Sequence, residues 1–199
     1  EAEVSTSDIG TDEKKIKLGL RLGYGIPMGD AAEDGEFSEL LSGMVPIWLD
    51  AGYMVTQNVL LGAYFQYGIG FAGDGCPSAA DCSGSDVRFG VQGQYHFSPG
   101  QSTQPWVGLG VGYEIATLNL EADGFEGSIS GKGFEFLNLQ GGADFEVADA
   151  FVVGPFASFS LGQFSSSTVD DGSTSESEDI EDKAFHQWFT FGAKGTFSL

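Results

Sequence analysis

Basic side chains are scarce in this chain of 199 residues. It has 8 lysines and arginines against 29 aspartates and glutamates, which gives a formal net charge of -21. A charge this negative repels phosphate backbones, so we expect no nucleic-acid partner. Hydrophobic residues nevertheless make up 41% of the chain. That share is too high for a disordered acidic protein, and it predicts a folded chain.

Long hydrophobic runs and helical periodicity are missing as well. No apolar stretch approaches the roughly 18 residues that a membrane-spanning helix needs. Apolar residues instead alternate with small or polar ones, which is typical of strands with one apolar face. We expect eight strands, near residues 16–26, 44–55, 59–71, 86–97, 105–115, 133–147, 151–164 and 184–199. Most are long enough to cross a bilayer at a tilt, which takes roughly 9–11 residues.

The connections between these strands alternate between long and short. Long ones fall at 27–43, 72–85, 117–132 and 165–183, and they hold 17 of the 29 acidic residues. Short ones fall at 56–58, 98–104 and 148–150. Short turns at one end and long loops at the other, on an even number of strands, are typical of bacterial outer-membrane barrels. The sequence therefore predicts an all-β, eight-stranded, antiparallel up-and-down transmembrane barrel with short periplasmic turns and long extracellular loops.

The two faces of the strands indicate which side meets lipid. The polar face is rich in glycine, as the crowded lumen of an eight-stranded barrel requires. Tyrosines and phenylalanines near strand ends on the apolar face match interfacial girdles: Tyr24, Tyr53, Tyr67, Tyr95, Tyr113, Phe97 and Phe197. Large aromatic residues assigned to the lumen are Trp48, Tyr64, Trp106, Phe156 and Trp188. Glu135 is the one acid that the alternation places on the apolar face.

The run Gly-Leu-Gly-Val-Gly-Tyr at 108–113 and the ending Phe-Thr-Phe-Gly-Ala-Lys-Gly-Thr-Phe-Ser-Leu complete the pattern. From residue 15 to residue 199 the chain resembles the small outer-membrane barrels of the OmpA transmembrane-domain, OmpX and OmpW type. The family's ending usually stops on an aromatic residue, whereas here Leu199 is last and Phe197 lies two before it. The resemblance implies a Gram-negative outer-membrane location, a signal peptide already removed and contact with lipid and lipopolysaccharide. We expect residues 1–14 to form a flexible periplasmic tail and 15–199 the barrel domain.

Charged residues of both signs fall on the lumen face. We expect a lumen charge network of Lys17, Arg21, Asp50, Arg88, Glu114, Asp144 and Lys194, with Glu146 on the same face. Arg88 with Glu114 and Arg21 with Asp50 are the expected neighbouring pairs. An interior network of ion pairs, which satisfies buried charge, is the favoured interpretation. A gated ion path is the alternative.

Few residues are candidates for other chemistry. Cys76 and Cys82, close together in an otherwise cysteine-free chain, predict a disulfide that would stabilise a small loop by roughly 2 kcal/mol. No further Cys or His lies nearby for zinc, and we expect no metal and no cofactor. His186 with Ser158 or Ser160 could form a nucleophile–base pair, but no local motif supports it. The segment 165–183 lacks the ligand spacing of a calcium loop and predicts a solvated acidic loop.

Taken together, the sequence favours a non-enzymatic outer-membrane barrel that displays acidic loops above a plugged polar lumen. Its expected role is structural or surface-interacting, with an envelope or surface protein as a possible partner. The alternatives are a narrow pore of OmpW type, a lipid-modifying outer-membrane enzyme and, last, a soluble ligand-binding barrel.

Overall fold

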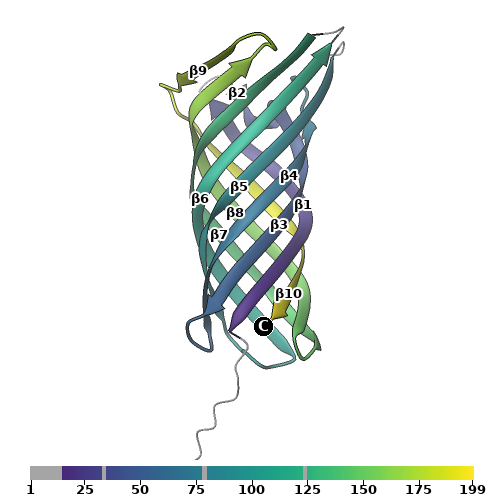
Figure 1. Cartoon of the computed structure of the whole chain (residues 1–199), viewed down its shortest axis with the longest axis vertical. Coiled ribbons are helices and arrows are strands. Elements are labelled where there is room, and N and C mark those ends of the chain that lie inside the picture. The colour runs from purple at the N-terminus through teal and green to yellow at the C-terminus, as the bar shows by residue number, and fades with distance from the viewer. Residues whose placement is uncertain (1–14, 33–34, 78–79, 123–124) are drawn as a thin grey trace, which may run out of the picture.

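The period-two stretches form strands, and each pairs with its neighbours along the chain (Figure 1). The computed structural model describes residues 15–32, 35–77, 80–122 and 125–199. The elements in chain order are β1 (Ile16–Ala32), β2 (Gly35–Glu36), α1 (Phe37–Leu40), β3 (Leu41–Met54), β4 (Val59–Ala72), β5 (Asp81–His96), β6 (Thr103–Ala122), β7 (Phe125–Ala148), β8 (Phe151–Asp170), β9 (Ser175–Asp179) and β10 (Phe185–Ser198). The expected tail of residues 1–14 lies outside the described residues.

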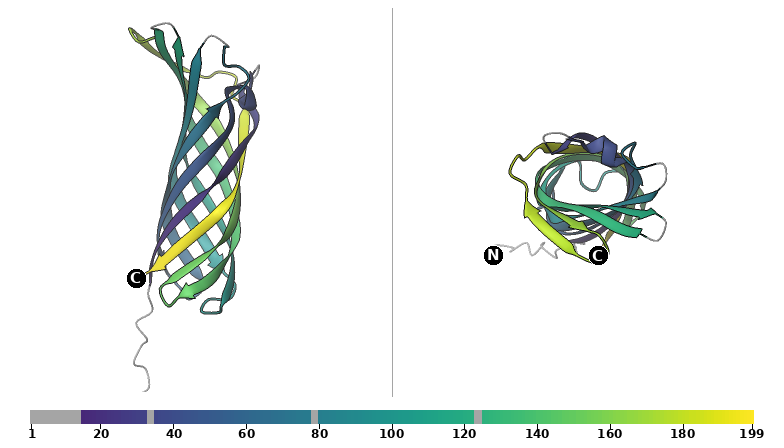
Figure 2. Two further views of the ribbon diagram at one scale, coloured as in Figure 1. Left: turned by 90° about the vertical axis from the view of Figure 1, so that its right-hand side faces the viewer. Right: turned by 90° about the horizontal axis from the view of Figure 1, so that it is seen from above.

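The eight long strands close into an antiparallel up-and-down barrel. Consecutive long strands pair from β1 to β8, and β10 pairs with both β8 and β1, which closes the ring. The view down the axis shows that closure (Figure 2). The predicted fold class is confirmed.

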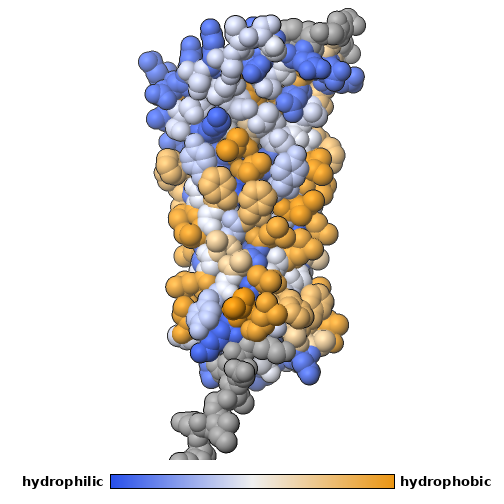
Figure 3. Space-filling model, in the orientation of Figure 1, coloured by the Kyte–Doolittle hydropathy of each residue, from blue (hydrophilic) through white to orange (hydrophobic). Residues whose placement is uncertain are grey.

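Apolar side chains form a belt on the face of the barrel that Figure 3 shows. Leu20, Phe65, Val91 and Leu109 are each about half exposed, at 47%, 45%, 60% and 57%. Soluble proteins rarely expose a continuous apolar surface of this extent. No helix among the described residues is long and apolar enough to cross a membrane. Outward apolar side chains that alternate along each strand are what a transmembrane barrel presents to lipid.

The strands run further than the alternation predicted. β6 and β7 stay paired up to Ala122 and Phe125, so the described part of the expected loop 117–132 is a hairpin. β8 continues to Asp170 and pairs there with β9, so the segment 165–183 also holds strand. Pairing continues above the belt because Leu118 and Leu120 keep the inner face apolar. The far ends of β6, β7 and β8, together with β9, thus extend the sheet beyond the barrel (Figure 2).

Irregularities in β7 change which side chains point inward. The prediction that Glu135 lies on the apolar outer face is wrong, because a register shift falls between Glu135 and Leu137. The extra residue turns Phe134 and Phe136 outward, at 56% and 51% exposed, and buries Glu135 at 1%. Glu146 keeps the expected inner face, because Phe145 and Val147 on either side of it point outward. It is nevertheless exposed, since it lies at the open end of the lumen and lines the cavity there.

Candidate functional site

An apolar cluster, which we call the plug, lies inside the barrel toward the end that carries β9. Helix α1 tucks the Phe37 side chain inward, where it is 1% exposed. Its ring centroid lies 5.2 Å from that of Trp188 and 4.9 Å from that of His186. The plug consists of Phe37, Leu41, Met44, Ala116, Leu118, Phe164 and Trp188. The first long connection therefore contributes to the core.

An upper charge cluster lies next to the plug, built around Arg88 of β5. Its members are Asp86, Arg88, Glu114, Glu135 and His186, each at most 2% exposed. Arg88 Nε donates to Asp86 Oδ2 at 2.7 Å and lies 3.7 Å from Glu114 Oε1. Arg88 Nη1 lies 3.5 Å from Glu135 Oε1, so one guanidinium faces three carboxylates. Tyr64 also donates to Glu135.

Glu114 ties this cluster to the plug. His186 Nε2 lies 2.8 Å from Glu114 Oε2, and Trp188 Nε1 donates to Glu114 Oε1 at 2.9 Å. The rings of His186 and Trp188 both contact the Phe37 ring, so the charge cluster positions the side chains against which Phe37 packs. Gly162 gives the space for this arrangement, because a Cβ there would lie 2.7 Å from His186 Nε2.

A lower charge cluster surrounds Arg21 of β1, which is fully buried. Arg21 forms a two-point ion pair with Asp50, at 2.7 and 2.8 Å. It also donates to Gln140 at 2.9 Å and to Gln92 at 3.3 Å. Its guanidinium carbon lies 4.3 Å from the centre of the Trp48 ring. All five aromatic residues assigned to the lumen are buried, as expected: Trp48, Tyr64, Trp106, Phe156 and Trp188.

The remaining members of the expected network lie toward the end with the chain termini. Lys194 Nζ is 3.6 Å from Asp144 Oδ2 and donates to Gln94 at 3.3 Å. Lys17 donates to Ser198 at 2.6 Å. The seven predicted residues thus fall into three groups along the barrel: one around Arg88, one around Arg21 and one around Lys194.

The candidate serine–histidine pairs are not brought together. Ser160 accepts a hydrogen bond from Arg88 at 3.0 Å, and the register places it opposite Trp188. Ser158 lies opposite Thr190. His186 instead contacts Glu114, so the nucleophile–base contact that such chemistry needs is not formed between these residues. No group of three or more His, Cys, Asp or Glu in the described ranges is arranged to hold a metal ion.

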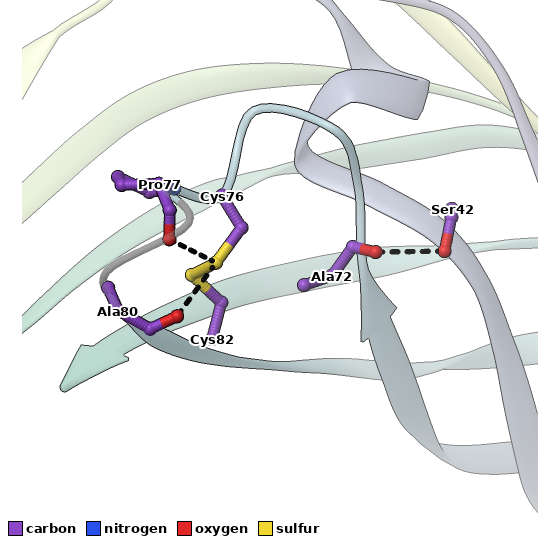
Figure 4. Close-up of a disulfide and its surroundings, with 6 residues drawn as sticks. All are labelled: Ser42, Ala72, Cys76, Pro77, Ala80 and Cys82. Carbon is purple, nitrogen blue, oxygen red and sulfur yellow. Dashed lines mark hydrogen bonds between the residues drawn. A yellow bond between two sulfur atoms is a disulfide. The ribbon is translucent and has the colours of Figure 1, made fainter.

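Cys76 and Cys82 form a disulfide with an S–S distance of 1.96 Å. It joins the start of β5 to the connection that follows β4 (Figure 4). Ser42 donates to the carbonyl of Ala72 at 3.0 Å beside this loop. The bridge fixes the edge of the extended sheet next to α1.

Sequence reasoning missed several residues of the lumen. Asp86 lies two positions before Arg88 on the same face, so the period of two could have identified it. The inward placement of Glu135 depends on the β7 bulge, and the alternation of apolar residues gives no sign of that bulge. Phe37 stands alone in an acidic connection, and nothing there marks it as a core residue.

The whole barrel resembles solved structures of outer-membrane proteins. A major outer-membrane protein from Thermus thermophilus has 13% identity and a TM-score of 0.60, with 92% of this chain and 99% of that one covered. Neisserial surface protein A has 11% identity and a TM-score of 0.55, with coverages of 92% and 97%. OprG from Pseudomonas aeruginosa has 13% identity and a TM-score of 0.53, with coverages of 94% and 98%. No family model and no curated protein sequence matches the chain. The chain therefore has the fold of the small eight-stranded outer-membrane β-barrel proteins.

Proposed function

We propose that this protein is a non-enzymatic, integral outer-membrane barrel that displays an acidic sheet for interaction at the cell surface. The observation that carries the proposal is the contrast between a filled lumen and an extended sheet. Ion pairs and aromatic side chains occupy the interior at two levels, below an apolar plug. Beyond the belt, parts of β5, β6, β7 and β8 continue together with β9. We call this extension the acidic platform.

Carboxylates on the platform lie directly opposite one another. Asp81 pairs in register with Glu121, and Glu121 with Glu126. Like charges at such positions destabilise a sheet. With Asp170 they border a hollow of about 530 Å³. Because these carboxylates do not stabilise the sheet, their arrangement supports a role in binding a cationic partner at the surface.

The arrangement of the lumen supports a non-enzymatic role and a closed barrel. Neither Ser158 nor Ser160 is paired with His186, and the buried polar side chains mostly serve one another. Lipid and lipopolysaccharide would surround the apolar belt, with the platform above them. A narrow pore of OmpW type remains the runner-up, and it requires the plug and both charge clusters to move aside.

The surface role can be tested on whole cells. Intact cells that express the full chain, shown by fractionation to carry it in the outer membrane, are incubated with fluorescent polylysine. The test variant is the triple substitution Glu121→Gln, Glu126→Gln and Asp170→Asn. The matched control is Glu146→Gln with Asp149→Asn, at the other end of the barrel.

We expect the platform variant to bind less polylysine than the parent, and the control to bind the same amount. The difference should shrink at high salt, because exposed charges are screened. Equal binding by the platform variant and the parent, at equal surface amounts, would contradict the proposed role.

A further inference from the structure

A cavity opens at the end of the barrel where the chain termini lie. Its volume is about 500 Å³, within the range of about 300–1,000 Å³ that is typical of small-molecule sites. Three of the chain's eight basic residues line it: Lys15, Lys17 and Lys194. His96, one of two histidines, lines it as well. We call this cavity the periplasmic vestibule. With three lysines and three acidic residues in its lining, the cavity is far less negative than the protein as a whole, whose net charge is -21.

Two lysines lie on the inner wall of the vestibule. Lys194 is 3% exposed, and its Nζ lies 4.1 Å from the centre of the Trp106 ring. Lys17 on β1 lies beside β10, opposite Ser198. His96 lines the same cavity as Lys194 and Lys17. These three groups therefore face a shared space from β1, β5 and β10.

Two polar atoms on this wall lack a hydrogen-bond partner within the part of the chain that the structure describes. They are Nε2 of His96 and Oγ1 of Thr196. Thr196 is 8% exposed, and both residues line the vestibule. Buried polar groups in native proteins are nearly always hydrogen-bonded, so each unpaired one calls for an explanation. Both can donate a hydrogen bond, which is what an anion accepts.

Three acidic residues line the vestibule too, and one of them, Asp144, belongs to this wall. Asp144 accepts from Trp106 Nε1 at 3.1 Å and is 3.6 Å from Lys194 Nζ, so the charges of Asp144 and Lys194 offset each other. Glu146 and Asp149 are exposed, near and within the turn between β7 and β8. The inner wall thus holds Lys17 beside the Lys194–Asp144 pair, and the rim holds Lys15 with Glu146 and Asp149.

We propose that the periplasmic vestibule is a binding site for a small oxyanion, a molecule that carries a phosphate or carboxylate group. Lys17 and Lys194 attract the anionic group, and Thr196 and His96 donate hydrogen bonds to it. The inference goes beyond the surface role proposed above, since it concerns the opposite end of the barrel.

The test uses the full chain, folded in detergent micelles and labelled with ¹⁵N. Inorganic phosphate and citrate are titrated separately, with sodium chloride at matched ionic strength as the reference. The variants are Lys17→Gln, which removes a charge, and Thr196→Val, which removes an unpaired hydroxyl at nearly constant shape. Lys183→Gln is the matched control, because it removes a lysine at the other end. Heat-modifiable gel migration shows that each variant is folded.

We expect saturable shifts of the amide signals of residues 93–96 and 194–198 with at least one of the two anions. Lys17→Gln should weaken binding by about 10-fold and Thr196→Val by about 5-fold, as the loss of a charged and of a neutral hydrogen bond implies. Lys183→Gln should bind as the parent does. The proposal is overturned by shifts that sodium chloride reproduces, by no saturable shift with either anion, or by equal affinity in all variants.

Discussion

Removing the Arg88 side chain should destabilise the barrel more than any other single truncation of a lumen cation. Arg88 faces Asp86, Glu114 and Glu135 within 3.7 Å, and all of these groups are buried. The substitution Arg88→Met keeps much of the volume but leaves three carboxylates with no guanidinium. Breaking a buried ion pair by removing one partner costs about 3–5 kcal/mol. We expect a loss at the upper end of that range, about 5 kcal/mol.

Arg21→Met is the informative comparison, because Arg21 faces the single carboxylate of Asp50. Gln92 would still donate to Asp50, at 2.6 Å in the parent, so we expect a smaller loss of about 3 kcal/mol. The free energy of unfolding is measured by urea titration in lipid vesicles, followed by tryptophan fluorescence. Adding Asp86→Asn to Arg88→Met should recover part of the stability, because one unpaired charge is removed. A loss below about 1 kcal/mol for Arg88→Met, or no recovery in the double variant, would show that Asp86, Glu114 and Glu135 do not depend on the guanidinium.

Three further predictions concern the plug, the disulfide and the turn of the acidic platform. Phe37→Ala should cost about 3 kcal/mol of unfolding free energy, because it opens a void in the plug, and Phe37→Leu should cost less; urea titration measures both. Replacing Cys76 and Cys82 together with serine should cost roughly 2 kcal/mol, and dithiothreitol should lower the parent to the same value while leaving the variant unchanged. Hydrogen bonds from Thr174 and Ser173 hold the pKa of the Asp171 carboxyl below its ordinary value. The carboxylate of Asp171 should therefore stabilise the turn between β8 and β9 fully above pH ~3.9. This stabilisation is lost as the pH falls through the lowered pKa of Asp171. The chemical shift of the Thr174 amide, measured against pH, reports the opening of the turn. A Thr174 signal that changes only above that pH would contradict the assignment.

The sequence predicted the barrel because its period of two is directly physical. A strand with one apolar face must turn that face to lipid or to a core, and long strands with alternating loop lengths leave few ways to do so. Arg21 with Asp50, and Arg88 with Glu114, could be paired in advance because neighbouring strands bring residues of similar height together. The five aromatic residues of the lumen followed from the same alternation.

What the sequence could not predict depends on breaks in that alternation. The β7 bulge near Leu137 reverses the side on which Glu135 falls, and no residue in the bulge marks it. Phe37 enters the core from a connection, so no strand pattern governs it. The sheet above the belt was missed because its strands carry polar and acidic residues on the exposed face, as loops do.

Single-channel recording in planar lipid bilayers shows whether the barrel is closed to ions. The full chain is inserted into the bilayer, and heat-modifiable gel migration of the same protein sample shows that it is folded. With the plug and both charge clusters in place, we expect no sustained openings across the physiological range of voltage. Sustained openings that depend on the folded protein would show that the lumen conducts ions and would favour the narrow pore.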